Sequence, residues 1–155
     1  MFGFKKKKKK EVFVPVDGEL ILLEKVADPV FAQGMMGAGY AVEPANGEVY
    51  SPVVGKVASI FPTKHAVGLV MEDGTEVLVH LGIDTVELDG AGFTSYVNAG
   101  DKVDQDTKLI SMDLATLKSN DKPATVMVLF PGKMGETFTI NEGPVKKGEV
   151  VLELE

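Results

Sequence analysis

The sequence contains no cysteine and no tryptophan, and all sixteen of its basic residues are lysine. Without cysteine the chain has no disulfide, no thiolate metal site and no cysteine nucleophile, which suits a reducing cytoplasm. Without arginine it lacks the bidentate guanidinium fork that commonly binds phosphate or nucleic acid. A phosphoryl group held by this chain would therefore depend on imidazole, hydroxyl and backbone N–H groups.

Long apolar runs and helical periodicity are also scarce. No stretch approaches the length of a membrane span, and we expect no signal peptide because the charged start lacks an apolar segment. One short helix is expected, from Ser111 to Lys118. Elsewhere, short apolar runs separated by glycine, proline and aspartate predict an all-β protein, an antiparallel β-sandwich or barrel. The length suits one domain, which we place at residues 11–155.

Internal pseudo-repeats support this fold class. Residues 15–20, 44–49 and 52–57 each consist of proline, two residues, glycine, a charged residue and an aliphatic residue. Residues 98–103 and 141–145 also resemble one another and are centred on a glycine. Each pattern predicts a turn that leads into an apolar strand, and such repeated units can stack into one core.

Charge is distributed unevenly along the chain. The formal net charge is −7, and residues 5–10 are six consecutive lysines, so the rest of the chain carries −13. An acidic body argues against nucleic acid as a partner and suits a basic protein surface. We expect residues 1–10 to form a disordered Lys-rich tail. The alternative is a weak contact of Lys5–Lys10 with an anionic membrane surface.

The two histidines, His65 and His80, flank a predicted β-hairpin. Asp73-Gly74 between two apolar, β-branched runs is a strong hairpin signal. A two-residue loop at Asp73-Gly74 would pair Val67 with His80. Because side chains alternate along a strand, His65 would then lie diagonal to His80 on the same face.

The same register assigns side chains to the two faces of the hairpin. Val67, Leu69 and Leu78 are expected on the histidine face, and Ala66, Gly68, Val70, Val77, Val79 and Leu81 on the other. Two neighbouring imidazoles indicate phosphoryl transfer or metal binding. The alternative is that both histidines only fill polar gaps in a covered sheet.

The chemistry of neighbouring residues fits phosphoryl transfer. A neutral imidazole can attack phosphorus, and a second imidazole can donate N–H to the phosphoryl oxygens. Thr63 lies two residues before His65, so its hydroxyl can bond the far ring nitrogen and fix the tautomer. Asp84 either orients a histidine, meets a basic partner or caps a turn. A zinc site would have His65, His80 and at best one carboxylate, so a partner would have to add a ligand.

Two segments carry a family resemblance. Residues 61–66, Phe-Pro-Thr-Lys-His-Ala, and residues 77–88, which contain His-Leu-Gly-Ile-Asp-Thr-Val, resemble the active-site segments of the glucose-family enzyme IIA of the bacterial phosphotransferase system. The resemblance extends over residues 11–155. It implies an antiparallel β-sandwich phosphocarrier that needs no cofactor and works in the cytoplasm during sugar uptake.

The resemblance also implies roles for individual residues. His80 would accept a phosphoryl group from phosphorylated HPr and pass it to a cysteine of an enzyme IIB domain of a sugar permease. His65 would hydrogen-bond the phosphoryl group, supported by Thr63. An apolar docking rim and two acidic residues would meet the partner: Val30, Phe31, Phe61, Leu78 and Val86, with Asp28 and Asp84. Some relatives bind zinc between the two histidines when docked to a partner.

A second function remains open for this sequence. In that alternative the chain is a non-catalytic regulatory or binding domain, and His65 and His80 serve only for metal or partner contact. A carrier of the lipoyl or biotinyl type does not fit, because the predicted hairpin tip is Asp73-Gly74 and holds no lysine to modify.

Overall fold

The structure is a computed structural model, and it describes residues 10–154. The expected Lys-rich tail therefore lies outside the described residues, except for Lys10. Lys10 opens the first strand, one residue before the predicted domain boundary, and its ammonium group pairs with the Asp73 carboxylate.

Strands account for most of the regular structure in this part of the chain. They are β1 (Lys10–Phe13), β2 (Gly18–Leu22), β3 (Ala38–Pro44), β4 (Glu48–Tyr50), β5 (Gly55–Ile60), β6 (Ala66–Met71), β7 (Glu76–Leu81), β8 (Phe93–Ser95), β9 (Lys102–Val103), β10 (Lys108–Met112), β11 (Val126–Phe130), β12 (Gly143–Val145) and β13 (Val150–Leu154). The helices are short: α1 (Pro29–Ala32), α2 (Leu114–Ser119) and the 3-10 turns η1 (Leu23–Lys25), η2 (Thr85–Leu88) and η3 (Pro131–Lys133).

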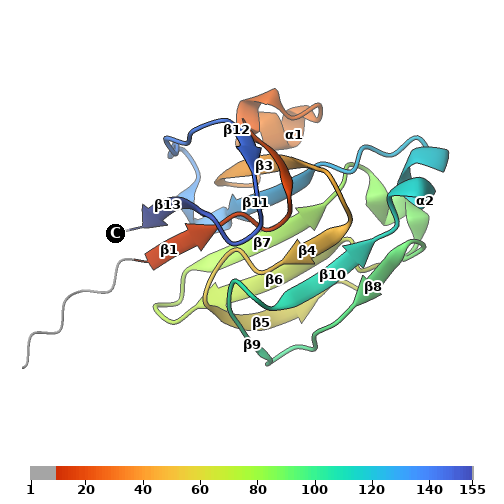
Figure 1. Ribbon diagram of the computed structural model, residues 1–155. Coiled ribbons are helices and arrows are strands. Elements are labelled where there is room, and N and C mark those ends of the chain that lie inside the picture. The colour runs from red at the N-terminus through yellow and green to blue at the C-terminus, as the bar shows by residue number, and fades with distance from the viewer. Residues whose placement is uncertain (1–9, 155) are drawn as a thin grey trace, which may run out of the picture.

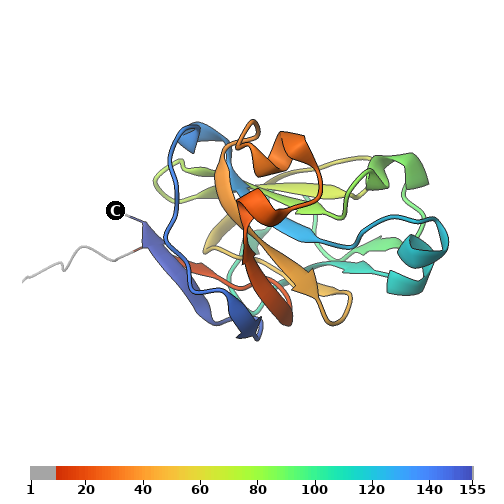
Figure 2. The ribbon, with the colours of Figure 1, turned by 90° about the horizontal axis from the view of Figure 1, so that it is seen from above.

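The strands form two facing layers. The larger sheet has the order β12-β2-β3-β11-β7-β6-β5-β9, and the smaller has the order β4-β10-β8, while β1 and β13 form a separate ribbon. In Figure 1 the smaller sheet lies in front of β5, β6 and β7, and the turned view in Figure 2 separates the layers. The main apolar cluster contains residues of both sheets, such as Val79 of β7 and Ile110 of β10. The antiparallel β-sandwich predicted from the sequence is confirmed.

β11 is buried on both of its faces. Val126, Val128 and Phe130 belong to the main core, whereas Met127 and Leu129 belong to a second, smaller apolar cluster on the other side of the large sheet. All five residues of β11 are buried. This explains the unbroken apolar run of the strand, because an alternating pattern is expected only where one face meets solvent.

The loop between β6 and β7 is longer than predicted. The N–H of Gly74 donates to the Met71 carbonyl and the N–H of Met71 donates to the Thr75 carbonyl, so three residues form the loop instead of two. Gly74 has φ of 90°, as expected for a three-residue loop that combines a type I turn with a left-handed residue.

This extra residue shifts the register by one. Ala66 pairs with His80, and Val67 pairs with Val79. The predicted pairing of Val67 with His80 is therefore wrong, and so are the predicted faces of the β6 side chains, whereas those of the β7 side chains are confirmed. Val67, Leu69, Met71, Val77, Val79 and Leu81 point into the main core. By alternation, Ala66, Gly68, Val70, Leu78 and His80 share the opposite face.

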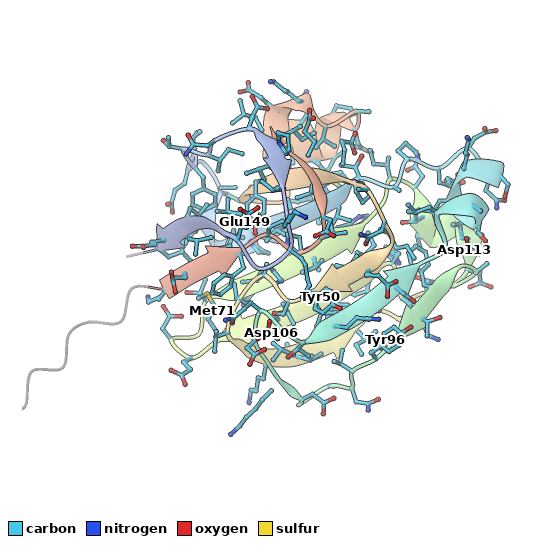
Figure 3. The ribbon with its side chains drawn as sticks, viewed as in Figure 1. Tyr50, Met71, Tyr96, Asp106, Asp113 and Glu149 are labelled. Atoms are coloured by element: carbon cyan, nitrogen blue, oxygen red, sulfur yellow. The ribbon has the colours of Figure 1, made fainter. Side chains whose placement is uncertain are left out.

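The predicted helix over Ser111–Lys118 starts too early. Ser111 and Met112 end β10, and α2 begins only at Leu114. The reason is Asp113, whose carboxylate accepts hydrogen bonds from the N–H groups of Ala115 and Thr116 and so caps the helix. Asp113 lies at the junction between β10 and α2 (Figure 3).

The glycine-centred patterns do precede strands, as predicted. Gly18 and Gly55 are the first residues of β2 and β5, Gly47 immediately precedes β4, and Gly143 begins β12. The repeated pattern thus marks turn-to-strand junctions spread over the sandwich.

A buried tyrosine connects the large sheet to β1. The Tyr40 side chain is fully buried, and its hydroxyl donates to the Phe13 carbonyl at 2.8 Å. Burial raises the pKa of Tyr40 well above its ordinary value. We predict that Tyr40→Phe lowers the free energy of unfolding by about 1 kcal/mol, because one buried hydrogen bond is lost. Urea unfolding measures this difference.

The matched control is Tyr96→Phe. Tyr96, which is labelled in Figure 3, is 52% exposed. Its hydroxyl bonds Ser111 at the surface, so loss of this hydroxyl should change stability by less than about 0.5 kcal/mol. Equal effects of the two substitutions would contradict the role of the Tyr40 hydroxyl.

Candidate functional site

His80 lies near the end of β7, on the face of the large sheet opposite to the main core. Its cross-strand neighbours are Ala66 of β6 and Met127 of β11. Met127 belongs to the second apolar cluster, against which Leu78 also packs. The His80 imidazole is therefore supported from beneath by apolar side chains and only half-buried at its outer side.

His65 reaches the same place from a turn before β6. Lys64 adopts a left-handed conformation with φ of 58°, and its N–H donates to the Phe61 carbonyl at 2.7 Å. The His65 carbonyl accepts from the N–H of Leu81 at 2.8 Å, which ties the turn to the end of β7. The ring centroids of His65 and His80 are 5.2 Å apart with an interplanar angle of 75°. The predicted proximity of the two histidines is confirmed, although by the Lys64 turn and not by the predicted register.

Two phenylalanines flank the imidazole pair. The Phe31 ring lies 4.8 Å from the His80 ring, and the Phe61 ring lies 5.3 Å from the His65 ring, centroid to centroid. Phe31 belongs to α1, which begins after Asp28 because the Asp28 carboxylate accepts from the N–H of Val30. Sequence reasoning placed both phenylalanines at a docking rim, and the structure brings both against the histidines.

Each imidazole has a hydrogen bond at Nδ1. His80 Nδ1 donates to the Gly82 carbonyl oxygen at 2.9 Å, since a carbonyl can only accept. This leaves Nε2 of His80 unprotonated in the neutral ring, with its lone pair free. Nδ1 of His65 is hydrogen-bonded to the Thr63 hydroxyl. The predicted contact between Thr63 and His65 is thus present.

The surroundings favour neutral imidazoles. Burial, followed by the proximity of His65, lowers the pKa of His80 to about 4, while the Gly82 carbonyl, Asp28 and Asp84 act in the opposite direction. Burial also lowers the pKa of His65. Both rings are therefore uncharged at neutral pH, which is the form of imidazole that can act as a nucleophile.

The residues predicted for a docking rim differ in exposure. Val30, Phe61 and Val86 are 42%, 39% and 52% exposed, whereas Phe31 is buried and Leu78 half-buried. Exposed side chains such as these three can meet a partner, while Phe31 and Leu78 support the site from within. Val86 lies in η2, directly after the Asp84-Thr85 junction.

Asp84 does not cap η2 with its side chain. It adopts a left-handed conformation with φ of 59°, and its carboxylate makes no capping hydrogen bond. Of the alternatives considered from the sequence, the turn-capping role is therefore wrong. Its exposed carboxylate instead adds negative charge near His80, as does that of Asp28.

Gly82 is a site residue that sequence reasoning missed. It contributes a backbone carbonyl, and a backbone atom leaves no chemical signal in the side-chain pattern. The available signal was its position: a glycine two residues after a histidine, at the end of an apolar strand. Gly82 has φ of 81°, a conformation that glycine adopts most readily.

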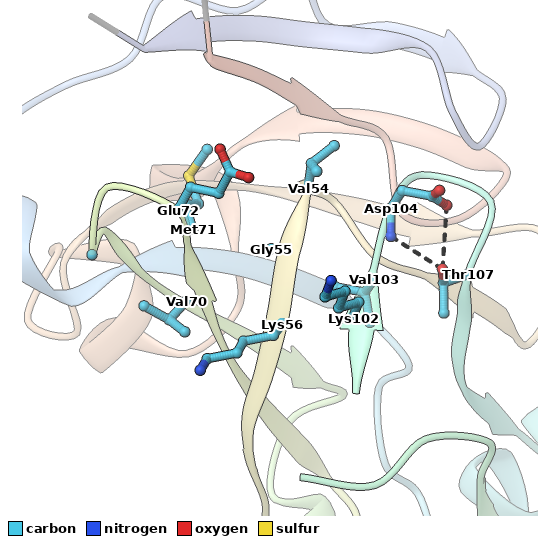
Figure 4. A pocket seen from close by; sticks show the side chains of 11 residues that line it. Val54, Gly55, Lys56, Val70, Met71, Glu72, Lys102, Val103, Asp104 and Thr107 are labelled. Atoms are coloured by element: carbon cyan, nitrogen blue, oxygen red, sulfur yellow. Dashed lines mark hydrogen bonds between the residues drawn. The ribbon is translucent and has the colours of Figure 1, made fainter. Parts of the chain in front are cut away.

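A hollow at the other end of the hairpin is separate from this site. Figure 4 shows it between β5, the tip of the β6–β7 hairpin and β9, with Lys56 and Lys102 on one side and Glu72 and Asp104 on the other. Its volume is about 640 Å³. It contains neither histidine, and its mixed charges favour no single class of ligand.

The described residues contain no ready-made metal site. Nowhere between residues 10 and 154 do three or more histidine, aspartate or glutamate side chains gather so that they could hold a metal ion. In the same part of the chain, no helix is both long and apolar enough to cross a membrane.

Fold and site together define a class of protein. It is an antiparallel β-sandwich domain that presents two neutral imidazoles side by side, between two phenylalanines, at the edge of an apolar cluster. The model of one protein family, described as "phosphoenolpyruvate-dependent sugar phosphotransferase system, EIIA 1", matches residues 10–134. The chain belongs to this family, so the resemblance drawn from its two histidine segments is confirmed.

Individual relatives agree with the family. The chain is 45% identical over 153 residues to the "PTS system glucose-specific EIIA component" of Oceanobacillus iheyensis, covering 96% of this chain and 93% of that protein. It is 52% identical over 120 residues to the "PTS system glucose-specific EIICBA component" of Streptococcus pneumoniae, covering 77% of this chain but only 16% of that longer protein. Among solved structures, glucose permease IIA from Mycoplasma capricolum matches with a TM-score of 0.84 and 38% identity, over 97% of both chains.

The lowered pKa of His80 has a measurable consequence. We predict that an NMR titration of the imidazole signals finds His80 titrating near pH 4, well below the ordinary value of 6.5, and His65 titrating below 6.5. The unfolded chain binds these protons at higher pH than the folded chain does. The free energy of unfolding should therefore be highest above about pH 6.5 and fall as the pH decreases toward 4.

His65→Gln tests the second cause of the shift. Removal of the neighbouring imidazole should raise the pKa of His80, but not to 6.5, because burial is the larger cause of the shift. A His80 that titrates near 6.5 in the unsubstituted protein would contradict the buried, neutral site.

Proposed function

We propose that this protein is a phosphocarrier whose His80 accepts a phosphoryl group from phosphorylated HPr and passes it to a cysteine of an enzyme IIB domain. The observation that carries the proposal is the imidazole pair. Its rings lie 5.2 Å apart, and the Gly82 carbonyl holds the Nδ1 proton of His80 so that Nε2 keeps its lone pair.

The first transfer begins with the lone pair of His80 Nε2. It attacks phosphorus, the N–P bond forms, and the bond between phosphorus and the donor breaks with its electron pair leaving on the donor. The His80 ring gains positive charge as this bond forms. The Gly82 carbonyl, the acceptor for Nδ1–H, stabilises that charge, as do the nearby carboxylates of Asp28 and Asp84.

His65 would act on the transferred group. If the Thr63 hydroxyl donates to Nδ1 of His65, the proton of that ring resides on Nε2. Nε2–H can then donate to a phosphoryl oxygen bound to His80, because the rings are adjacent. In this scheme Thr63 fixes the tautomer and His65 stabilises the charge on the phosphoryl oxygens.

In the second transfer, a cysteine thiolate of the acceptor attacks phosphorus. The S–P bond forms, and the N–P bond breaks with its electron pair returning to Nε2 of His80. The buried surroundings of His80 help this step, because the departing imidazole becomes neutral again and burial favours the neutral form.

The surface around the site suits protein partners. Val30, Phe61 and Val86 are exposed apolar side chains, and Asp28 and Asp84 add negative charge. Exposed apolar groups together with acidic residues favour a partner surface that combines apolar and basic groups. The exposed members would contact HPr and then the IIB domain, with Phe31 and Leu78 supporting them.

The names of the relatives favour glucose as the sugar that the associated permease takes up. The proposed exchange with HPr places the protein's activity in the cytoplasm. No cofactor enters either step. A zinc ion between His65 and His80 would find two ligands in this chain, so a docked partner would have to complete its tetrahedral coordination.

His80→Gln tests the acceptor role. With phosphoenolpyruvate, enzyme I and HPr, the unsubstituted protein should gain one acid-labile, base-stable phosphoryl group, seen by intact mass, and His80→Gln should gain none. The variant should remain folded, because the side chain points away from the main core. Full labelling of His80→Gln would refute the assignment.

The absence of label on the folded, unsubstituted protein, with both donor proteins active, would refute the phosphocarrier role altogether. It would favour the alternative in which the two histidines serve for metal or partner contact only.

His65→Gln separates the two transfers. We expect HPr to phosphorylate this variant. The variant should pass the group to a IIB domain at least about tenfold more slowly, because the hydrogen bond from His65 that stabilises the charge on the phosphoryl oxygens is lost. The measurement is the decay of phosphorylated protein after the IIB domain is added. Loss of acceptance as complete as that of His80→Gln would show that His65 does not have a supporting role only.

A further inference from the structure

The carbonyl that binds His80 belongs to a turn whose backbone is held at every polar atom. In the peptide unit between Leu81 and Gly82, the carbonyl accepts from the Thr85 hydroxyl and the N–H donates to the Thr125 carbonyl at 2.8 Å. In the next unit, between Gly82 and Ile83, the carbonyl accepts from His80 Nδ1 and the N–H donates to the Pro123 carbonyl at 3.0 Å.

Three of these four hydrogen bonds are made by the backbone or by His80. Two come from the backbone of the segment before β11, and one is the bond to His80 itself. The fourth comes from a side chain, Thr85, which is completely buried and takes no part in the chemistry described above. This hydrogen bond, from a threonine hydroxyl to the carbonyl four residues earlier, depends on the residue type at position 85 and not on the backbone alone.

Thr85 also closes the space around Gly82. A Cβ atom at position 82 would lie 2.5 Å from the Thr85 methyl carbon and 2.8 Å from the Pro123 carbonyl oxygen. The Thr85 methyl group therefore packs directly against the glycine backbone. The methyl group fills this space, and the hydrogen bond from the hydroxyl is the contact that restricts rotation of the Leu81-Gly82 peptide unit.

Restricted rotation matters because the direction of the Gly82 carbonyl decides the tautomer of His80. If the Gly82 peptide unit turned, Nδ1 would lose its acceptor, and the proton could move to Nε2. A ring protonated at Nε2 has no lone pair there for phosphorus.

We propose that Thr85 is a positioning residue for phosphoryl transfer: its hydroxyl, which donates to the Leu81 carbonyl, fixes the Leu81-Gly82 turn, and the turn fixes the Nδ1–H tautomer of His80. This inference rests on the proposed function in that His80 is the acceptor. Thr85 itself touches neither imidazole in any contact that the structure shows, so it acts only through the turn.

A salt bridge further along supports a held turn. Glu87 of η2 pairs with Lys122 at 2.6 Å, and Lys122 belongs to the same segment that binds the turn through Pro123 and Thr125. The Lys122 side chain is only 17% exposed. η2 is thus connected to this segment by a side-chain contact of its own, and Thr85 is the residue of η2 that bonds the Leu81 carbonyl.

The test compares Thr85→Val, Thr85→Ser and the control Thr94→Val, which changes an exposed threonine of β8. Valine keeps the shape of threonine without the hydroxyl, and serine keeps the hydroxyl without the methyl. Long-range ¹H–¹⁵N spectra of the imidazole rings report the tautomer of His80, and intact mass during incubation with phosphoenolpyruvate, enzyme I and HPr reports the rate of phosphorylation.

We expect the parent and Thr94→Val to show the Nδ1–H tautomer and equal rates. Thr85→Val should show a mixture of tautomers and a rate lower by about five- to tenfold, the factor that corresponds to one hydrogen bond. Thr85→Ser should retain the parent tautomer. A purely structural role of Thr85 would lower thermal stability without changing the tautomer, and that result would overturn the proposal.

The outcomes distinguish this inference from the proposed function. Failure of the parent to become phosphorylated would refute the function and would leave the tautomer measurement to decide the role of Thr85. A phosphorylated parent with an unchanged Thr85→Val variant would refute only the role of Thr85. Should Thr85→Val not fold, Thr85→Ser decides, because loss of the Nδ1–H tautomer while the hydroxyl is present would contradict the proposed cause.

Discussion

The pairing of β11 with β3 and β7 is the constraint on which the rest of the structure depends. All five residues of β11 are buried, three in the main core and two in the second cluster. Because β11 contributes to both clusters, apolar side chains also cover the outer face of the large sheet next to His80, which pairs with Met127. The apolar side chains that support the imidazole are therefore part of the second cluster that β11 helps to form.

Burial and hydrogen bonding act on His80 in opposite directions. Burial disfavours the imidazolium ion and keeps the free ring neutral, while the Gly82 carbonyl and two nearby carboxylates favour positive charge. In the proposed function, the first effect suits a ring that offers a lone pair, and the second suits a ring that gains positive charge when it bonds to phosphorus. A carrier must both accept and release its group, and this balance limits how strongly either state is favoured.

The β6–β7 hairpin shows where inference from the sequence succeeded and where it failed. Asp73-Gly74 correctly marked a turn, and the two apolar runs correctly marked its strands. The loop length was wrong by one residue, because a three-residue loop with Gly74 in a left-handed conformation fits the same sequence. That error placed the β6 side chains on the wrong face relative to His80, while the β7 side chains were assigned correctly. His65 still reached His80, because Lys64 reverses the chain just before β6, a conformation that nothing in the pattern indicated.

The sequence by itself determined the all-β class, the glycine-centred turns, the two histidines and their family, because these depend on local pattern and residue type. Only the tertiary structure decided the register of the hairpin, the ring-to-ring contacts with Phe31 and Phe61, and the tautomer of His80. The Phe31 contact and the support of the tautomer depend on atoms far apart in the chain: the Gly82 turn, for example, is held by carbonyls of Pro123 and Thr125. Backbone groups of that kind carry no side-chain signature, so their role emerges only when the chain is folded.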